Sequence, residues 1–252
     1  MHTSIAAEVP GSDTLVIFIH GFLGSPDQFR RYIAALNEHG ASCLALLLPG
    51  HGCSAREFAR HGTAEWETAV LQAVEANKGK FTRIYLAGHS MGGLLALNAC
   101  VKLGNAFSGL ILLSTPWKVT FFSPRSIFQR LLLACYGRKN EIKTAYKSAQ
   151  SVSGNYLALL LHMPRPGLEF FRVIRRAKQI CSGVQVPVLL IHSKNDETVS
   201  FSSARLLKQS LAGAEAVPIT LQSSWHTYYT AEEADIIQRA ILSFVEPGPV
   251  LL

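Results

Sequence analysis

The segment Gly-His-Ser-Met-Gly-Gly at residues 88–93 constrains the possible fold more than any other feature of the sequence. It directly follows a strand-like apolar run at 83–87 and directly precedes a helix-like run at 94–100. A serine with small neighbours between a strand and a helix is typical of a nucleophile elbow, because larger flanking side chains would collide with both elements. The pattern therefore predicts that Ser90 presents its hydroxyl at the top of a sheet. The alternative is an ordinary glycine-rich turn.

Strand-like and helix-like segments alternate along most of the chain. Further strands are predicted at residues 14–20, 41–48, 108–114, 186–192 and 216–222. Helices are predicted at residues 26–39, 63–78, 202–211 and 231–244. This alternation predicts an α/β fold with a mostly parallel sheet. The strands are continuous Leu, Ile and Val runs rather than alternating ones, which indicates that helices cover both faces.

The first of these helices carries a start signal of its own. Ser25 is expected to be the N-cap and Pro26 to occupy the first turn, while Gln28 completes a capping box. Gly40 is expected to end the helix.

Residues 115–183 interrupt the alternation and look mostly helical and irregular. The sequence predicts a core formed by 1–114 and 184–252 and an inserted cap, or lid, formed by 115–183. Within the insertion, residues 117–180 contain twelve Lys and Arg against two acids, whereas the whole chain has a net charge of only +7. The positive charge is thus a property of the insertion, which suggests a separate surface with its own partner.

Two apolar stretches of the insertion are expected either to roof an acyl-chain pocket or to pack the cap on the core. The first comprises Phe121, Phe122, Ile127, Phe128, Leu131, Leu132 and Leu133, and the second is Tyr156–Leu161. The cationic residues are expected on the outer face, since unpaired Lys and Arg are almost never buried. That face is either a solvated surface or a docking surface for anionic membranes.

The composition limits the classes of protein to which the chain can belong. A chain of 252 residues with 48% hydrophobic content can bury one sizeable core. Its five cysteines are odd in number and lack paired spacing, which fits neither a disulfide framework nor a zinc site, so buried free thiols are expected. No signal-peptide pattern or span-length apolar run occurs, which predicts a cytoplasmic location. No cofactor and no metal is indicated.

A serine nucleophile needs a base, most often a histidine oriented by a carboxylate, and in a nucleophile-elbow fold the chain order is serine, acid, histidine. His226 is the only histidine beyond residue 192 and lies in the loop after the last predicted strand. Between Ser90 and His226, only Asp196 and Glu197 lie just past the C-terminal end of a core strand. Asp196 is preferred because its short side chain suits a fixed hydrogen bond to an imidazole, and Glu197 remains the alternative.

Acyl transfer places negative charge on the former carbonyl oxygen, which requires two preorganised donors. The backbone N–H of Met91 is expected to be one donor. The N–H of Phe22, in the loop after the first predicted strand, is expected to be the other.

Four other residues near these loops are expected to have supporting roles. His20 and His89 are expected to orient the loops of the site. His51 and Trp66 are expected to be structural.

Taken together, these motifs resemble those of the α/β-hydrolase superfamily over about residues 14–245. The resemblance rests on His20-Gly-Phe22, Leu48-Pro-Gly-His-Gly52, the 88–93 segment, Asp196 and Ser224-Trp-His226. More narrowly, Thr63-Ala-Glu-Trp66 and the acid-rich run after His226 resemble bacterial carboxylesterases and monoacylglycerol lipases. The resemblance implies a Ser-Asp-His esterase with a small helical cap, acting on monoesters of short or medium acyl chains, with Phe22 and Met91 at the oxyanion hole.

The chain also departs from that group. Trp225 stands where the group usually has glycine, which puts the width of the pocket beside the base in question. Only thirteen residues precede the first core strand, which leaves little room for an N-terminal antiparallel hairpin. The basic cap is not part of the family pattern.

Two classes of function are consistent with these sequence features. The first is an esterase or lipase that works through an acyl-Ser90 intermediate on a small-molecule acyl ester, with peripheral contact to an anionic membrane surface and no obligate nucleic acid. The second is a non-hydrolytic scaffold whose basic cap binds anionic lipid or nucleic acid. Lyase, thioesterase and haloperoxidase chemistry on the same residues lies between them, and the oligomeric state stays open.

Overall fold

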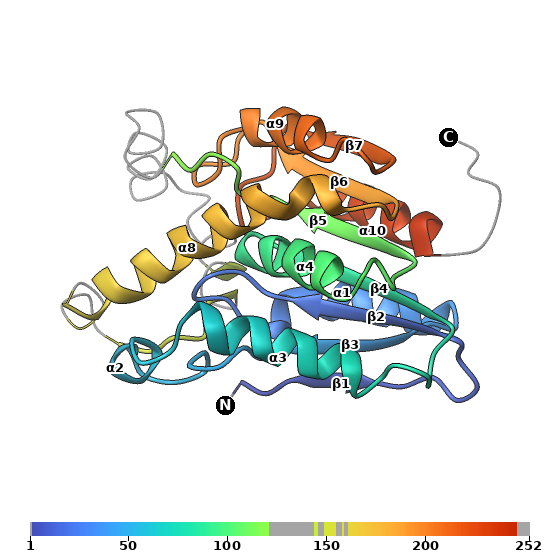
Figure 1. Cartoon of the computed structure of the whole chain (residues 1–252), viewed down its shortest axis with the longest axis horizontal. Helices are drawn as coiled ribbons and strands as arrows, with labels where there is room; N and C mark the ends of the chain where they lie inside the picture. Colours follow the sequence, from blue (N-terminus) through green and yellow to red (C-terminus); the bar gives the residue numbers. More distant parts are fainter. Residues whose placement is uncertain (1, 121–143, 146–148, 155–157, 159–160, 246–252) are drawn as a thin grey trace.

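The computed structural model describes residues 2–120, 144–145, 149–154, 158 and 161–245. A seven-stranded sheet runs through the centre in the order β1-β3-β2-β4-β5-β6-β7 (Figure 1). Its strands are β1 Ile5–Ala7, β2 Thr14–Ile19, β3 Ser42–Leu46, β4 Arg83–His89, β5 Gly109–Leu113, β6 Val188–Ser193 and β7 Ala216–Leu221. Only β1 pairs antiparallel, so the predicted mostly parallel sheet is confirmed.

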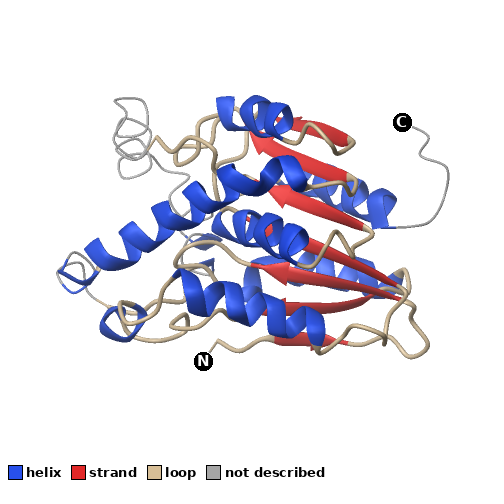
Figure 2. Ribbon diagram, in the orientation of Figure 1, coloured by secondary structure: helices blue, strands red, loops and turns tan. Residues whose placement is uncertain are grey.

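Helices cover both faces of the sheet, as the continuous apolar strands predict (Figure 2). They are α1 Arg30–Glu38, α2 Ala55–Phe58, α3 Thr63–Glu75, α4 Met91–Lys102, α8 Pro164–Ile180, α9 Ser202–Ser210 and α10 Ala231–Val245. Figure 1 shows α3, α4, α8 and α9 on one face and α1 and α10 on the other.

Strand β2 shows why these strands are apolar at every position. Leu15, Ile17 and Ile19 point into the core beneath α3, α4 and α8, whereas Val16 and Phe18 point into the core beneath α1 and α10. Successive side chains of a strand face opposite sides of the sheet, so a strand covered on both faces buries all of them. The carboxyl ends of the parallel strands form one edge of the sheet, where binding sites of such folds lie.

The first helical segment begins at Pro26 with Ser25 at the N-cap position, as predicted, but the predicted capping box is wrong. Pro26–Phe29 form a 3₁₀ turn, the α-helix begins only at Arg30, and the Ser25 side chain makes no capping hydrogen bond. Asp27 in this turn instead binds Arg30 and His2, so contacts outside a capping box shape the turn.

One expectation about the cysteines is also wrong. Cys53 is exposed, whereas Cys43, Cys100 and Cys181 are buried free thiols as expected. Cys135 lies outside the described residues. Cys53 is exposed because it lies in the loop before α2, away from either core cluster.

Between β5 and β6 the main described element is α8, which packs on α4 and α3. The division into a core and an inserted cap at 115–183 stays a prediction. The first predicted apolar cluster and most of the second lie outside the described residues. No helix in the described ranges is long and apolar enough to cross a bilayer.

Candidate active site

Ser90 lies at the turn between β4 and α4, where the backbone is strained. Its φ of 53° and ψ of −120° fall outside the regions that a non-glycine residue ordinarily adopts. A Cβ at Gly92 would lie 1.9 Å from the carbonyl oxygen of Ile19, and one at Gly88 would lie 2.3 Å from the backbone of Gly92. The two glycines are thus required by close backbone packing, and the turn has the geometry predicted for a nucleophile elbow.

The structure brings Ser90, His226 and Asp196 together in one buried chain of hydrogen bonds. His226 Nδ1 lies 2.8 Å from Asp196 Oδ2, and His226 Nε2 lies 3.0 Å from Ser90 Oγ. A carboxylate can only accept, so Nδ1 carries the proton and Nε2 accepts the hydrogen bond of the Ser90 hydroxyl. Nε2 is therefore placed to take the serine proton.

Asp196 is fixed by its own backbone neighbours as well as by the imidazole. Its Oδ1 accepts hydrogen bonds from the N–H groups of Thr198 at 2.9 Å and Val199 at 2.7 Å. Burial alone would raise the pKa of Asp196, but the His226 charge and hydrogen bond and these two amides lower it below its ordinary value. The carboxylate is ionised at neutral pH and stabilises a protonated His226.

The alternative acid, Glu197, has a different place in the site. Its Oε2 accepts the backbone N–H of His226 at 3.0 Å, while the imidazole ring binds Asp196 instead. Both acids of the Asp-Glu pair therefore contact His226, one at the ring and one at the main chain. The sequence indicates one acid partner for His226, and the contact of Glu197 with the main chain was not predicted.

Glu233 is a further residue that sequence reasoning missed. Its carboxylate accepts the N–H groups of Ser223 at 3.0 Å and Ser224 at 2.7 Å, in the loop that carries His226. Burial raises the pKa of Glu233, but these hydrogen bonds and that of the Ser224 hydroxyl outweigh it and lower the pKa. The Thr-x-x-Glu spacing from Thr230 to Glu233 is the signal that could have drawn attention to it.

The supporting histidines hold backbone in place, as expected. His89 Nε2 donates to the carbonyl oxygen of His226 at 2.8 Å. His20 Nε2 accepts the N–H of Leu48 at 3.1 Å, so its Nδ1 donates to the carbonyl of Gly21 at 2.9 Å. Burial lowers the pKa of His89 to about 3 and that of His20 to about 4. Both rings therefore stay neutral at neutral pH.

The two predicted oxyanion-hole donors belong to segments next to Ser90. Met91 is the first residue of α4, where helix amides have no intrahelical acceptor. Phe22 follows Gly21, at which a Cβ would lie only 3.0 Å from the Cβ of Ser90. Within the described part of the chain, neither the Met91 nor the Phe22 N–H donates a hydrogen bond. No acceptor among the described residues therefore occupies either amide.

The Phe22 loop is held from two sides. The Phe22 ring packs within 5.3 Å of Phe58, 6.3 Å of Trp66 and 5.4 Å of Phe170, measured between ring centroids. Trp66 also donates its indole N–H to the carbonyl of Pro49 at 3.0 Å, in keeping with its predicted structural role. These contacts hold the Phe22 side chain in place.

Residues of the segment after β5 complete this support. The N–H of Ser151 donates to the carbonyl of Leu23 at 2.9 Å, and the Ser151 hydroxyl donates to the carbonyl of Gly24. Leu23 itself has a φ of 61°, in the left-handed region. The loop after β2 is thus clamped in a strained conformation.

A cavity of about 230 Å³ opens over Ser90 and His226. Phe22, Leu23 and Phe170 supply its apolar wall, and Gln28, Gln150, Thr198 and Thr227 supply polar groups. Trp225 is not among the described lining residues, so the departure from the family pattern does not narrow this part of the pocket. The cavity is small and mostly apolar next to the Ser90 hydroxyl and the His226 imidazole, and its wall includes Phe22, which carries one of the two predicted donor amides.

The family of the chain follows from a comparison of its sequence with known families. Residues 10–233 match the model of the Hydrolase_4 family, which is described as serine aminopeptidase, S33. The match covers most of the chain, including the three residues of the hydrogen-bonded chain.

Individual relatives align over shorter stretches. An uncharacterized hydrolase, YugF, of Bacillus subtilis (strain 168) is 31% identical over 123 residues, which are 47% of this chain and 42% of the relative. A thermostable monoacylglycerol lipase of Bacillus sp. (strain H-257) is 30% identical over 82 residues, 32% of this chain and 33% of the relative. The chain thus spans less than half the length of these curated relatives.

A solved structure extends the similarity of fold to nearly the whole chain. A structure from the work on LipS and LipT, two metagenome-derived lipolytic enzymes, superposes with a TM-score of 0.73 and 18% identity, over 96% of each chain. At this identity the likeness establishes the fold alone.

Proposed function

The chain belongs to the serine aminopeptidase S33 family of α/β-hydrolases, and from that premise we propose that it is a serine hydrolase that cleaves carboxylic esters of short or medium acyl chains or monoacylglycerol-like lipids. The observation that carries the proposal is the buried hydrogen-bond chain from Asp196 through His226 to Ser90. A serine hydroxyl is a weak nucleophile at neutral pH, and this chain supplies the base that it lacks.

In the proposed reaction, Ser90 Oγ attacks the ester carbonyl carbon while His226 Nε2 takes its proton. The tetrahedral intermediate then breaks its bond to the alcohol oxygen, and the alcohol leaves with the proton held by His226. Water attacks the resulting acyl-Ser90 ester with His226 again as base, which releases the acid and restores the Ser90 hydroxyl. Asp196 stabilises the protonated imidazole in both halves and does not itself accept the proton.

The N–H groups of Phe22 and Met91 are the proposed oxyanion hole. The attack puts negative charge on the former carbonyl oxygen, and donors that are already oriented stabilise it without reorganisation. The support is that both amides are free within the described residues and that packing and hydrogen bonds fix the Phe22 loop. Loss of one such donor typically costs about 10²- to 10³-fold in kcat.

The walls of the cavity favour an ester over the N-terminal peptide implied by the family description. An aminopeptidase has to bind the positively charged amino terminus of its substrate, which calls for a carboxylate in the pocket. Among the described lining residues there is no Asp or Glu, and the nearby Asp196 and Glu197 are engaged with His226. Apolar walls at Phe22, Leu23 and Phe170 suit an acyl chain.

Turnover of a series of p-nitrophenyl esters of increasing chain length, measured beside an aminoacyl p-nitroanilide, tests this proposal. We expect kcat/KM to be highest for short or medium acyl chains and the anilide to be hydrolysed far more slowly. Ser90→Ala protein provides the blank for contaminating esterases. Faster hydrolysis of the anilide than of every ester would contradict the ester assignment and favour a peptidase.

The pH dependence of the same ester reaction is a second readout. Only a neutral imidazole can accept the serine proton, so turnover is expected to rise with pH and to level off, with an apparent midpoint at about pH 6 to 7. His89 and His20 are expected not to contribute above about pH 5, because burial holds the pKa of His89 at about 3 and that of His20 at about 4. A profile that is flat from about pH 5 to 9 would mean that a different base acts.

A further inference from the structure

Helix α8 has an inner face that belongs to the core. Its buried residues Pro166, Phe170, Val173, Ile174 and Ala177 recur at helical spacing and form one apolar stripe. Phe170 within this stripe packs on Phe22 and lines the cavity over Ser90. The orientation of α8 relative to the catalytic cavity is thus fixed by packing.

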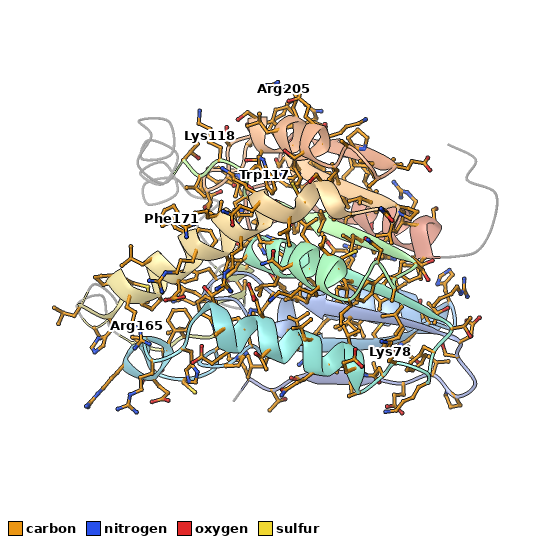
Figure 3. All side chains as sticks on the ribbon, viewed as in Figure 1. Lys78, Trp117, Lys118, Arg165, Phe171 and Arg205 are labelled. Atoms are coloured by element: carbon orange, nitrogen blue, oxygen red, sulfur yellow. The ribbon has the colours of Figure 1, made fainter. Side chains whose placement is uncertain are left out.

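The outer face of the same helix is also partly apolar. Leu168 is 64% exposed and Phe171 is 49% exposed, and Leu161, just before the helix, is 67% exposed. These are the three most exposed large hydrophobic side chains of the described residues. Figure 3 labels Phe171 and Arg165 on α8. A cluster of such side chains on the surface of a chain usually marks an interaction site.

Cations surround these apolar side chains. Arg165, Arg172, Arg175, Arg176 and Lys178 are all exposed on α8, whereas its single acid is Glu169. The outer face therefore carries a strong positive charge, as expected from the sequence of the insertion.

The single acid does not cancel that charge. Glu169 is turned toward α3, where its Oε2 accepts the hydroxyl of Thr63 at 2.8 Å and the Thr63 N–H at 3.2 Å. Arg172 pairs with Glu169, and Arg176 pairs with Glu67 at 3.1 Å. Arg165 and Arg175 have no ion pair with any described residue. Their charge is available to a partner.

We propose that the outer face of α8, defined by Leu161, Leu168, Phe171, Arg165 and Arg175, docks on anionic lipid surfaces. Exposed leucine and phenylalanine can enter the boundary between headgroups and acyl chains, and long arginine side chains can bind phosphates at the same depth. A nucleic acid would use the arginines but would leave Leu168 and Phe171 without apolar partners. The combination of exposed apolar side chains and unpaired cations therefore favours lipid.

Docking by α8 has a consequence for the site. Phe170 and Phe171 are consecutive residues with ring centroids 5.7 Å apart, one lining the cavity and the other facing outward. A lipid surface bound at Phe171 would thus lie beside the wall of the cavity over Ser90. This would deliver lipid-derived esters to the site, but binding itself does not depend on the proposed hydrolysis.

Co-sedimentation with vesicles of phosphatidylcholine containing phosphatidylserine, compared with vesicles of phosphatidylcholine alone, tests the proposal. Catalytically inactive Ser90→Ala protein is used in parallel, so that binding and hydrolysis are read separately. We expect both proteins to bind the anionic vesicles, to bind the neutral ones much more weakly, and to lose binding as added salt screens the charges. Absence of binding to anionic vesicles, or equal binding to both kinds, would overturn the proposal.

Matched variants assign any binding to α8. Removing two cations with Arg165→Gln and Arg175→Gln is expected to weaken binding about 30-fold, since each cation near an anionic surface contributes about fivefold. Lys78→Gln with Arg205→Gln removes the same charge from exposed positions elsewhere and is expected to change binding little (Figure 3). Equal losses in the two double variants would show that net charge alone acts and would overturn the assignment.

The apolar contribution is tested in the same way. Leu168→Ser with Phe171→Ser is expected to weaken binding to anionic vesicles at least tenfold, whereas Phe201→Ser, at a residue 38% exposed at the start of α9, is expected to have little effect. Circular dichroism verifies that each variant is folded. Unchanged vesicle binding in the apolar double variant, or tighter binding to duplex DNA than to anionic vesicles, would contradict lipid docking.

Discussion

Replacing Ser90 with alanine is expected to lower kcat for ester hydrolysis by about six orders of magnitude. The substitution removes the proposed nucleophile and leaves the proposed oxyanion donors and the cavity in place. Residual turnover then comes from water attack on an ester held by the Phe22 and Met91 amides. The measurement is kcat on the preferred ester, and thermal unfolding checks that the variant is folded, since Ser90 is buried.

A double variant tests whether Ser90 and His226 depend on each other in catalysis. In the proposed mechanism Ser90 and His226 act as one unit, so Ser90→Ala combined with His226→Ala is expected to be about as inactive as either single variant. Asp196→Asn, which leaves a partner for the imidazole but favours the wrong tautomer, is expected to lose about 10⁴-fold. A double variant with the product of the two single losses would contradict a common pathway through Ser90 and His226.

Gly92→Ala is expected to destabilise the fold more than any other single methyl addition near the site. The new Cβ would lie 1.9 Å from the carbonyl oxygen of Ile19 at the end of β2, and the strand is held by neighbours on both sides. Neither backbone segment can shift at low energetic cost. The free energy of unfolding is therefore expected to fall by more than about 3 kcal/mol. For a chain of this size that corresponds to a drop in Tm of about 6 to 12 °C.

Gly167→Ala is the matched control for that substitution. Gly167 lies in α8, and a Cβ there would meet nothing within 4 Å. Alanine is more favourable than glycine in a helix. The free energy of unfolding is therefore expected to stay unchanged or to rise by up to about 1 kcal/mol. If Gly92→Ala protein unfolds at the same temperature as Gly167→Ala protein, the tight approach of α4 to β2 is not required by the fold.

Much of the fold could be predicted because its strands are apolar on both faces. Strands such as β2, with Leu15 and Val16 in opposite cores, stand out from the sequence without any knowledge of their neighbours. Segments fixed by tertiary contacts could not be predicted. Strand β1 has three residues and α2 has four, which is too few for a periodic pattern. The turn at Pro26 starts where the sequence predicts, but it is a 3₁₀ turn without the predicted capping-box bond, and Asp27 in it binds Arg30 and His2.

The candidate site also contains residues that could be predicted from the sequence and contacts that could not. Ser90, Asp196 and His226 could be chosen because strand ends and chain order leave few candidates. The bond from the His226 amide to Glu197 and the bonds from the loop amides to Glu233 join residues that are 29 and 9 to 10 positions apart. Such contacts depend on how loops fold over the sheet edge, and no local pattern encodes them fully.

Mass spectrometry after treatment with a fluorophosphonate tests the central claim most directly. The reagent reacts with a serine only when a base activates its hydroxyl and donors stabilise the oxyanion that forms, so it reports on the assembled site without any assumption about the natural ester. We predict a single covalent adduct on the peptide that contains Ser90, which His226→Ala abolishes. Folded protein that carries no adduct at Ser90, or carries it on another serine, would contradict the assignment of Ser90 as the nucleophile.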